Sequence, residues 1–262
     1  MHRWLLCLFI PSWSFAATEL TFCYEDKALP PYYLGDNDRI PSTRPGASIE
    51  HLQRLVSQLP ATQLPDVTLK LVRLPWKRCL AALTTGQVDA LIASYRPERK
   101  TLGQYPLLQQ QPDPRRAFGE HRTCLVSRED ANWHWDGQRF HGLTELVIAR
   151  PLGYAPLKST TQQQMTMHYT LSGTMDLDLL AKGRVHAVTT LCEIAGRRLE
   201  PAEIRHRQLK VLFPPLHSNT GYLIFSHAFY QQHPAVAEQL WELLAKDKGE
   251  DIYLRYLDEL GR

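Results

Sequence analysis

The sequence has little net charge and, beyond its N-terminus, no long apolar run. Its 262 residues include 30 lysines and arginines against 27 aspartates and glutamates, a formal charge of +3 that is scattered along the chain. A charge this small does not favour nucleic acid as a partner. No later segment approaches the roughly 18 apolar residues that a membrane-spanning helix needs, so we expect no membrane helix in the mature chain.

The local signatures of common hydrolases and metal-dependent enzymes are also missing. The chain contains no G-x-S-x-G, no H-E-x-x-H and no G-x-x-x-x-G-K segment, and its cysteines do not have the spacing of a zinc site. Its 11 histidines are dispersed, and isolated histidines are more often surface or core groups than metal ligands. We therefore expect neither a metal nor a cofactor.

The N-terminus has the pattern of a secretory signal peptide. The first three residues carry positive charge, residues 4–15 are mostly apolar, and Ser14-Phe-Ala16 is a small-x-small cleavage site. We expect residues 1–16 to be removed during export to the periplasm. Cys7 lies too early in the chain to carry a lipid anchor.

Residues 75–106 are the most informative segment of the chain. Pro75 suits a first helical position, an apolar helical face follows it, and Gly86 ends the helix. Residues 88–93 are then almost continuously apolar, as in a strand that is covered on both faces, and Pro97 prevents its easy continuation. The segment therefore predicts a helix, a buried strand and a polar corner.

This polar corner is a candidate binding site. In open α/β sheets, ligands bind beyond the carboxyl ends of the strands. The loop after the predicted strand offers two hydroxyl groups and two guanidinium groups, from Ser94, Tyr95, Arg96 and Arg99. Binding residues are often carried by loops of this kind.

A second helix-glycine-strand unit indicates two lobes. Leu180-Ala-Lys-Gly-Arg-Val-His-Ala-Val188 has the apolar spacing and the glycine of Leu83-Thr-Thr-Gly-Gln-Val-Asp-Ala-Leu91. A chain of 262 residues that is 44% hydrophobic can bury one large core or two modest ones. We predict two similar α/β lobes rather than one continuous sheet: residues 17–118 and 214–262 form the first lobe, and residues 119–213 the second.

Apolar patterns predict further elements in both lobes. In the first lobe, strands are expected at 20–24 and 67–72 and a helix at 49–59. In the second lobe, strands are expected at 123–127 and 146–149. The return to the first lobe consists of a strand at 221–226 and helices at 234–246 and 249–260.

The predicted export makes the cysteines candidates for disulfides. Four cysteines follow the signal peptide, an even number for an oxidising compartment, and they allow three pairings. We favour Cys23 with Cys79 and Cys124 with Cys192, because each bridge then stays inside one lobe and leaves the lobes free to open and close. Four buried free thiols are the alternative.

Taken together, the motifs resemble family 3 of the periplasmic solute-binding proteins. The strongest match is Trp76 at a helix start, then L-x-x-G-x-V-D-A, an apolar strand and Pro97-Glu-Arg-Lys100 before an aromatic-Pro pair. Cys23-Tyr-Glu-Asp-Lys-Ala-Leu-Pro-Pro-Tyr32 and Gly46-Ala-Ser-Ile-Glu50 resemble the family's first ligand-side loop and the start of its next helix. The resemblance implies a two-lobed α/β periplasmic-binding-protein-like fold of type 2, each lobe a mixed sheet flanked by helices, with a ligand cleft between the lobes.

The resemblance also implies a function. Members of this family are receptors, not enzymes, that close over a small polar solute and deliver it to an ABC permease, and we expect this chain to act as a monomer. Two alternatives on the same fold stay open. One is a periplasmic dehydratase with Glu193 or His186 as general acid beside Arg99. The other is a binding subunit that passes its signal to a sensor protein.

Ligand contacts in the first lobe follow residue by residue from the resemblance. Arg99 resembles the arginine that clamps a ligand carboxylate through two parallel N–H bonds. Arg96 competes for this role, because the loop is about two residues shorter than the usual family pattern. Trp76 and Tyr32 resemble the aromatic walls of the cleft. Polar positions beside the ligand are matched by Glu25, Asp26, Ser94 and Tyr95.

The second lobe departs from the family pattern. Leu191 stands where an aspartate usually meets the ammonium group of an amino acid, and the nearest acid is Glu193. The loop that usually caps the ligand carboxylate is here Arg150-Pro-Leu-Gly-Tyr-Ala155, which adds the cation of Arg150 and the ring of Tyr154. An anionic or aromatic solute fits this lobe better than a standard α-amino acid.

Overall fold

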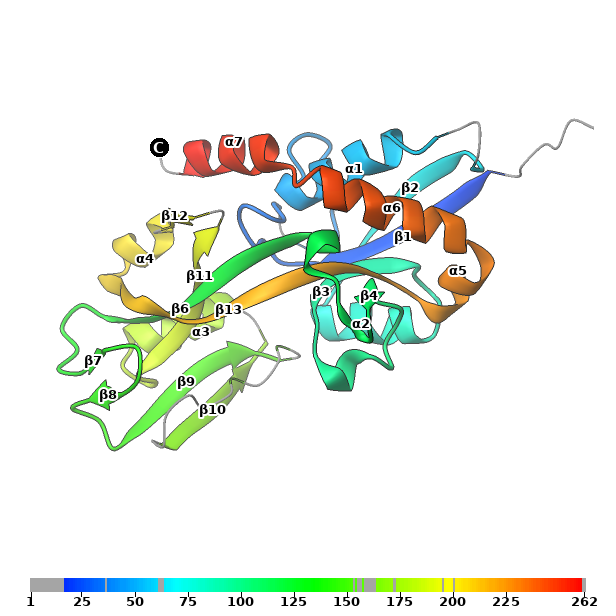
Figure 1. Cartoon of the computed structure of the whole chain (residues 1–262). Coiled ribbons are helices and arrows are strands. Elements are labelled where there is room, and N and C mark those ends of the chain that lie inside the picture. Colours follow the sequence, from blue (N-terminus) through cyan, green and yellow to red (C-terminus); the bar gives the residue numbers. More distant parts are fainter. Residues whose placement is uncertain are drawn as a thin grey trace, which may run out of the picture.

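The computed structural model describes residues 17–35, 37–60, 64–152, 154, 157, 164–171, 173–194, 196–199 and 201–260. The predicted signal peptide, residues 1–16, lies outside the described residues. The chain forms a mixed α/β structure in which helices flank one long, curled sheet (Figure 1). None of the described helices has the length and apolar character needed to cross a membrane.

One half of the molecule contains both ends of the described chain. Its elements are β1 (Thr18–Glu25), α1 (Ala47–Ser57), β2 (Val67–Leu74), α2 (Trp76–Thr84), β3 (Ala90–Ser94), η1 (Pro97–Arg99), β4 (Leu107–Leu108), β5 (Gln111–Pro112), η2 (Pro114–Arg116), α5 (His227–Gln232), α6 (Pro234–Lys246) and α7 (Glu250–Leu260). Strand β1 is parallel to β2 and β3. Apolar side chains of α1, α6 and α7 pack on one face of these strands, and those of α2 pack on the other. Buried side chains therefore cover both faces, as the apolar run of β3 predicts.

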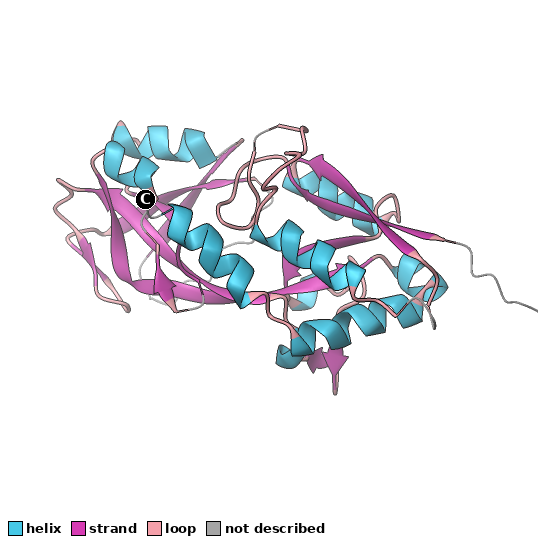
Figure 2. Ribbon diagram, turned by 90° about the horizontal axis from the view of Figure 1, so that it is seen from above, coloured by secondary structure: helices cyan, strands magenta, loops and turns pink. Residues whose placement is uncertain are grey.

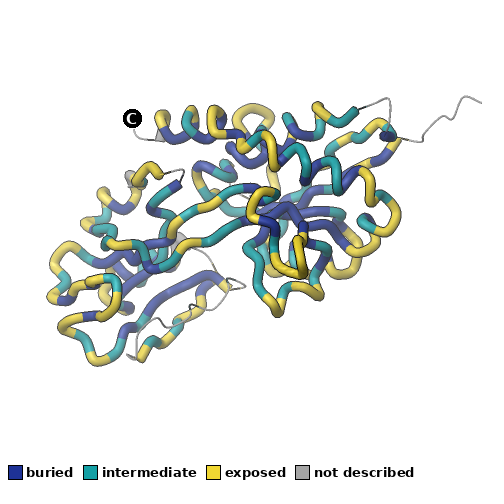
Figure 3. The backbone as a smooth tube through the Cα atoms, viewed as in Figure 1, coloured by how far each residue is buried: buried dark blue, intermediate teal, exposed yellow. Residues whose placement is uncertain are grey.

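The other half is built from the middle of the chain. Its elements are β6 (Gly119–Arg128), β7 (His134–Trp135), β8 (Phe140–His141), β9 (Glu145–Pro151), β10 (Gln164–Thr170), α3 (Gly173–Ala181), β11 (Ala187–Ile194), β12 (Arg197–Arg198), α4 (Ala202–His206) and β13 (Leu209–Phe225). Two apolar clusters cover the two faces of its sheet, one with the aromatic rings around β7 and β8 and the other with α3 and α4. Figure 3 shows these buried segments separately from the buried centre of the first half.

The sheet is continuous, so the prediction of two separate sheets was wrong. Its strand order is β10-β9-β11-β6-β13-β3-β1-β2, and β6 and β13 run antiparallel through the middle (Figures 1 and 2). The apolar patterns revealed only parts of these two strands, at 123–127 and 221–226. The rest of β13 is more polar, and Pro214-Pro215 lies where its register to β6 shifts. The predicted lobe boundaries, at 118/119 and 213/214, stay a prediction.

Both predicted disulfides are confirmed. Cys23 of β1 is bonded to Cys79 of α2, and Cys124 of β6 is bonded to Cys192 of β11. The paired Cα atoms are 5.7 and 5.6 Å apart, inside the usual range for a disulfide. Each bridge joins neighbouring elements of one half, so neither bridge ties the two halves together.

Candidate functional site

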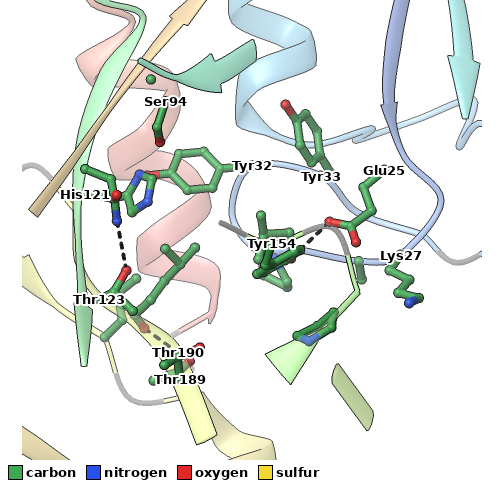
Figure 4. Close-up of a pocket in the computed structure, with 18 of the residues that line it drawn as sticks. Glu25, Lys27, Tyr32, Tyr33, Ser94, His121, Thr123, Tyr154, Thr189 and Thr190 are labelled. Carbon is green, nitrogen blue, oxygen red and sulfur yellow. Dashed lines mark hydrogen bonds between the residues drawn. The ribbon is translucent and has the colours of Figure 1, made fainter. Parts of the chain in front are cut away.

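A cavity of about 900 Å³ lies between the two halves of the molecule. Its walls come from the loop after β1, the start of α2, the corner after β3, the paired strands β6 and β13, and β9, β11 and α3 of the second half. Figure 4 shows side chains from both halves converging on this space. The predicted site residues that line it are Tyr32, Trp76, Ser94, Arg99, Arg150 and Tyr154.

Two aromatic residues of the first half contribute to the wall. Trp76 is the first residue of α2, where Pro75 precedes it and sets the direction of the chain. The ring of Tyr32 packs against Tyr253 and His121, with both centroid separations at 5.8 Å. Burial raises the pKa of Tyr32 well above its usual value, so its hydroxyl group stays neutral. This wall offers flat apolar faces to a solute.

The corner after β3 brings two guanidinium groups to the cavity. Arg99, in η1, donates from Nη1 to the carbonyl oxygen of Ser94 at 3.3 Å. Burial lowers the pKa of Arg99, and the charge of Arg96 adds to this effect. Arg96 also lines the cavity, and its buried Nε has no hydrogen-bond partner among the described residues. Two cations therefore lie together in a partly desolvated corner.

Two of the predicted first-lobe residues do not line the cavity. Tyr95 turns its ring edge-on to Tyr105, at a centroid separation of 5.3 Å. Asp26 donates its backbone N–H to the carbonyl oxygen of Leu74 at 3.1 Å, while its neighbour Glu25 lines the cavity instead. We leave Tyr95 and Asp26 out of the proposed ligand contacts.

The second half adds a third guanidinium and a contact that reaches the first half. Arg150, near the end of β9, is 7% exposed, and burial lowers its pKa. Its guanidinium carbon lies 5.7 Å from the centre of the Tyr154 ring. The Tyr154 hydroxyl donates to Oε2 of Glu25 at 3.0 Å (Figure 4). Burial raises the pKa of Glu25, and the bond from Tyr154 partly opposes that rise. This bond connects the two halves, and both of its residues line the cavity.

The sequence did not identify two histidines that line the cavity. His121 lies on β6 and His217 on β13, and burial lowers the pKa of each to about 4. Alternate residues of both strands face the cavity: His121 and Thr123 on β6, and His217 and Asn219 on β13. The register pairs His217 with Thr123 and Asn219 with His121. This alternation of residues that face the cavity is present in the sequence. It can be recognised only when both strands are known to continue beyond their apolar segments.

No acid of β11 lines the cavity, in keeping with the leucine at position 191, and an acid from a different element lines it. Leu191 lines the cavity, while Glu193 lies 3.4 Å from Arg122 in an ion pair outside the lining. Nδ1 of His186 accepts the backbone N–H of Val147 at 3.0 Å, and His186 is also outside the lining. Asp176 of α3 lines the cavity, and burial raises its pKa to about 6.

The site is suited to holding an anionic group away from water. Three guanidinium groups and two neutral histidines surround a space that has aromatic rings on one side. Charge-assisted hydrogen bonds are stronger in such an enclosed site than in bulk water. The carboxylates of Glu25 and Asp176 are already bonded to the hydroxyl groups of Tyr154 and Thr170.

Comparison with known proteins identifies the fold. No family model and no curated protein sequence matches the chain. The probable amino-acid ABC transporter extracellular-binding protein ytmK from Bacillus subtilis matches in structure with 12% identity and a TM-score of 0.61, over 92% of this chain and 98% of that chain. An arginine 3rd transport system periplasmic binding protein from Legionella pneumophila matches with 16% identity and a TM-score of 0.63, over 93% and 99%.

A third match comes from the structural work on glutathione import via GshT and the cystine ABC importer TcyBC of Streptococcus mutans. It has 15% identity and a TM-score of 0.63, over 92% of this chain and 95% of that chain. At such low identity these likenesses establish the fold and leave the ligand open. The predicted fold class is confirmed: the chain has the two-lobed α/β fold of periplasmic solute-binding proteins.

Proposed function

We propose that this protein is an exported receptor that captures a small polar or anionic solute between its two lobes and delivers it to an ABC importer. The observation that carries the proposal is the cavity of about 900 Å³ lined by both lobes. It is supported by the fold, which the chain shares with proteins named as binding components of amino-acid transporters. The two buried disulfides fit an oxidising compartment such as the periplasm.

The proposed roles of the residues follow from their positions. Arg99, with Arg96 beside it, holds an anionic group of the solute, and Trp76 and Tyr32 cover its apolar part. Ser94 supplies a hydroxyl group next to Arg99. When the lobes close, Arg150 and Tyr154 of the second lobe complete the site, and Tyr154 bonds to Glu25 of the first lobe. A solute favours the closed form only as far as it binds that form more tightly than the open one.

Closure is the event that a membrane permease recognises in this proposal. The strands β6 and β13 are the paired connection between the lobes, so bending along them permits the movement. The receptor acts as a monomer and needs no cofactor. A role in signalling instead of import is tested by solute uptake: deletion of the gene abolishes uptake of the bound solute in an import system and leaves uptake intact in a sensory one.

The dehydratase alternative is not favoured by the geometry. The two residues predicted as general acids, Glu193 and His186, lie outside the cavity lining, where each has a partner of its own. Asp176 and Glu25 are closer to the proposed solute, but both accept a hydroxyl hydrogen bond that holds their carboxylates in place.

A thermal-shift screen of the purified mature chain tests the proposal. The panel contains amino acids, polyamines, aliphatic organic acids and aromatic acids, and each sample is also analysed for product. A solute present at 100 times its Kd adds about 2.7 kcal/mol to the free energy of unfolding. The proposal expects at least one saturable shift without conversion of the solute. A panel without any shift would refute it, and so would a shift accompanied by turnover.

A further inference from the structure

We infer that the solute is a hydroxylated acid whose hydroxyl groups bind to polar side chains on the two strands that connect the lobes. These side chains form a polar floor in the cavity, which consists of His121 and Thr123 of β6 and His217 and Asn219 of β13. The inference rests on the proposed function, in which first-lobe arginines hold an acidic group, and it adds the chemical class of the rest of the solute.

The register of β6 and β13 places the four side chains of the polar floor on one face of the sheet. Side chains of a strand alternate between its two faces, so positions 121 and 123 share a face, and so do positions 217 and 219. The antiparallel register pairs His217 with Thr123 and Asn219 with His121. The two histidines are therefore diagonal neighbours across the strands, close enough for a single solute to contact both.

The polar atoms of this floor are directed into the cavity. Within the described part of the chain, one hydrogen bond links its members, from Nδ2 of Asn219 to Oγ1 of Thr123 at 3.2 Å. The ring nitrogens of His121 and His217 form no hydrogen bond to another described residue, and both rings are partly exposed to the cavity. Figure 4 shows His121 and Thr123 on the same side of the cavity. A solute can therefore bond to the two imidazoles without breaking a contact within the protein.

The floor matches a hydroxyl group better than a second charged group. Burial lowers the pKa of both histidines to about 4, and the charges of Arg150 and Arg96 add to this effect on His217. A neutral imidazole has one donor and one acceptor nitrogen, and the side chain of Asn219 also offers both functions. A hydroxyl group donates and accepts, whereas a carboxylate only accepts and an ammonium group only donates. The nearby guanidinium charges also repel an ammonium group.

The polar floor lies beside the other parts of the proposed site. The charge of the corner after β3 contributes to the low pKa of His217, and the ring centroids of His121 and Tyr32 are 5.8 Å apart. Two further hydroxyl groups line the second-lobe side, from Thr189 and Thr190 of β11. A cavity of about 900 Å³ accommodates several hydroxylated carbon atoms next to an acidic group.

Matched pairs of acids test the inference by isothermal titration calorimetry on the mature chain, residues 17–262. The hydroxylated probes are gluconate, quinate and protocatechuate. Each is compared with the acid of the same carbon skeleton without added hydroxyl groups, which is hexanoate, cyclohexanecarboxylate or benzoate. The best hydroxylated acid is expected to bind about 10- to 100-fold more tightly than its partner, because the partner leaves polar atoms of the floor unpaired. The aromatic wall of Trp76 and Tyr32 favours the more apolar partner, so it cannot produce this preference.

Variants of the floor then identify the residues that hold the hydroxyl groups. His121→Phe and His217→Phe keep an aromatic ring and remove both nitrogens, so each is expected to reduce the preference for the hydroxylated acid about 10-fold. Affinity for the partner acid is expected to stay unchanged. His227→Phe is the matched control, because His227 is exposed at the start of α5 and outside the cavity lining. Thermal melts establish folding, and Thr123→Val tests the floor without altering a ring if a histidine variant does not fold.

The possible outcomes separate the inference from the proposed function. Equal affinity for a hydroxylated acid and its partner, or tighter binding of the partner, overturns the inference and leaves the solute receptor standing. Binding confined to solutes of the thermal-shift panel that carry no hydroxyl group has the same meaning. Absence of binding by every solute of both panels overturns the receptor as well. Loss of the hydroxyl preference in the floor variants, with the control unchanged, supports the inference.

Discussion

Removal of the disulfide between Cys124 and Cys192 is expected to destabilise the protein strongly without changing its site. All four bridged cysteines are fully buried, and this pair is separated by 68 residues in the sequence. In the chain-entropy description, closing a loop of this length stabilises the folded state by about 4 kcal/mol. The bridge between Cys23 and Cys79, separated by 56 residues, has nearly the same expected value. Total stabilities of small proteins are only about 5 to 15 kcal/mol, so either loss is large.

The assay is urea unfolding of the double variant Cys124→Ala/Cys192→Ala, followed by tryptophan fluorescence and compared with the unaltered chain. The free energy of unfolding is expected to fall by about 4 kcal/mol. Because the bridge joins β6 to β11 inside one lobe, solute affinity is expected to change less than about twofold. A loss below about 1 kcal/mol contradicts the stabilising role of the bridge. Four free thiols in the denatured, unreduced protein refute the pairing itself.

Three further perturbations test single contacts. Tyr154→Phe removes the 3.0 Å bond to Glu25 between the lobes, so solute affinity is expected to fall about 10- to 100-fold in calorimetry; an unchanged Kd refutes its role in closure. Burial lowers the pKa of His51 to about 4, below the unfolded value of about 6.5, so the unfolded state takes up the proton first. The contribution of His51 to stability is complete above pH 6.5, and roughly 3 kcal/mol of it is lost between pH 6.5 and 4; His121 and His217, whose pKa values burial also lowers to about 4, add losses over the same range. Urea titrations of the unaltered chain and of His51→Gln measure the share of His51 as the difference between their losses of stability over this pH range. Gly46 has φ +119°, and an added Cβ would lie 2.2 Å from the carbonyl oxygen of Tyr32. Gly46→Ala should therefore lower the melting temperature by several degrees or more. An unchanged melting temperature contradicts the close approach of Gly46 to Tyr32.

Local pattern was sufficient for much of the fold. Helix α6 was predicted at 234–246 and occupies those residues, because its apolar spacing and the proline at its start are local features. Strand β3 was predicted within two residues of its ends for the same reason. The disulfides required one more step, the assumption that each bridge stays inside one lobe, and both predicted pairings are present in the structure.

The connection between the lobes could not be predicted in the same way. Strand β13 extends over 17 residues, but only its last part is apolar enough to read as a strand. Its polar part is held by pairing with β6, a contact between residues about 90 positions apart. Pairing of this kind depends on tertiary context that no short window contains. The two histidines of the site, His121 and His217, were missed because they lie on these polar stretches.

Predicted residues of both lobes line the cavity, and the two that do not, Tyr95 and Asp26, belong to the first lobe. Arg99, Ser94 and Trp76 follow directly from the helix-strand-corner order, so their arrival at the cavity was a local inference. Tyr95 was included because it belongs to the loop after the predicted strand and offers a hydroxyl group, but adjacent residues at a strand end point in different directions, and its ring packs against Tyr105. Asp176 reaches the cavity from α3, a helix whose approach to β9 depends on the packing of the whole lobe.

Calorimetric titration of the mature chain with its best-binding solute is the most direct test of a two-lobed receptor. The account predicts saturable binding of one solute per chain, with the solute recovered chemically unchanged. It also predicts that Arg96→Gln weakens this binding, because Arg96 lies in the cavity with a buried Nε that has no partner among the described residues. Conversion of the solute to a product, or the absence of saturable binding across the whole panel, would contradict the account.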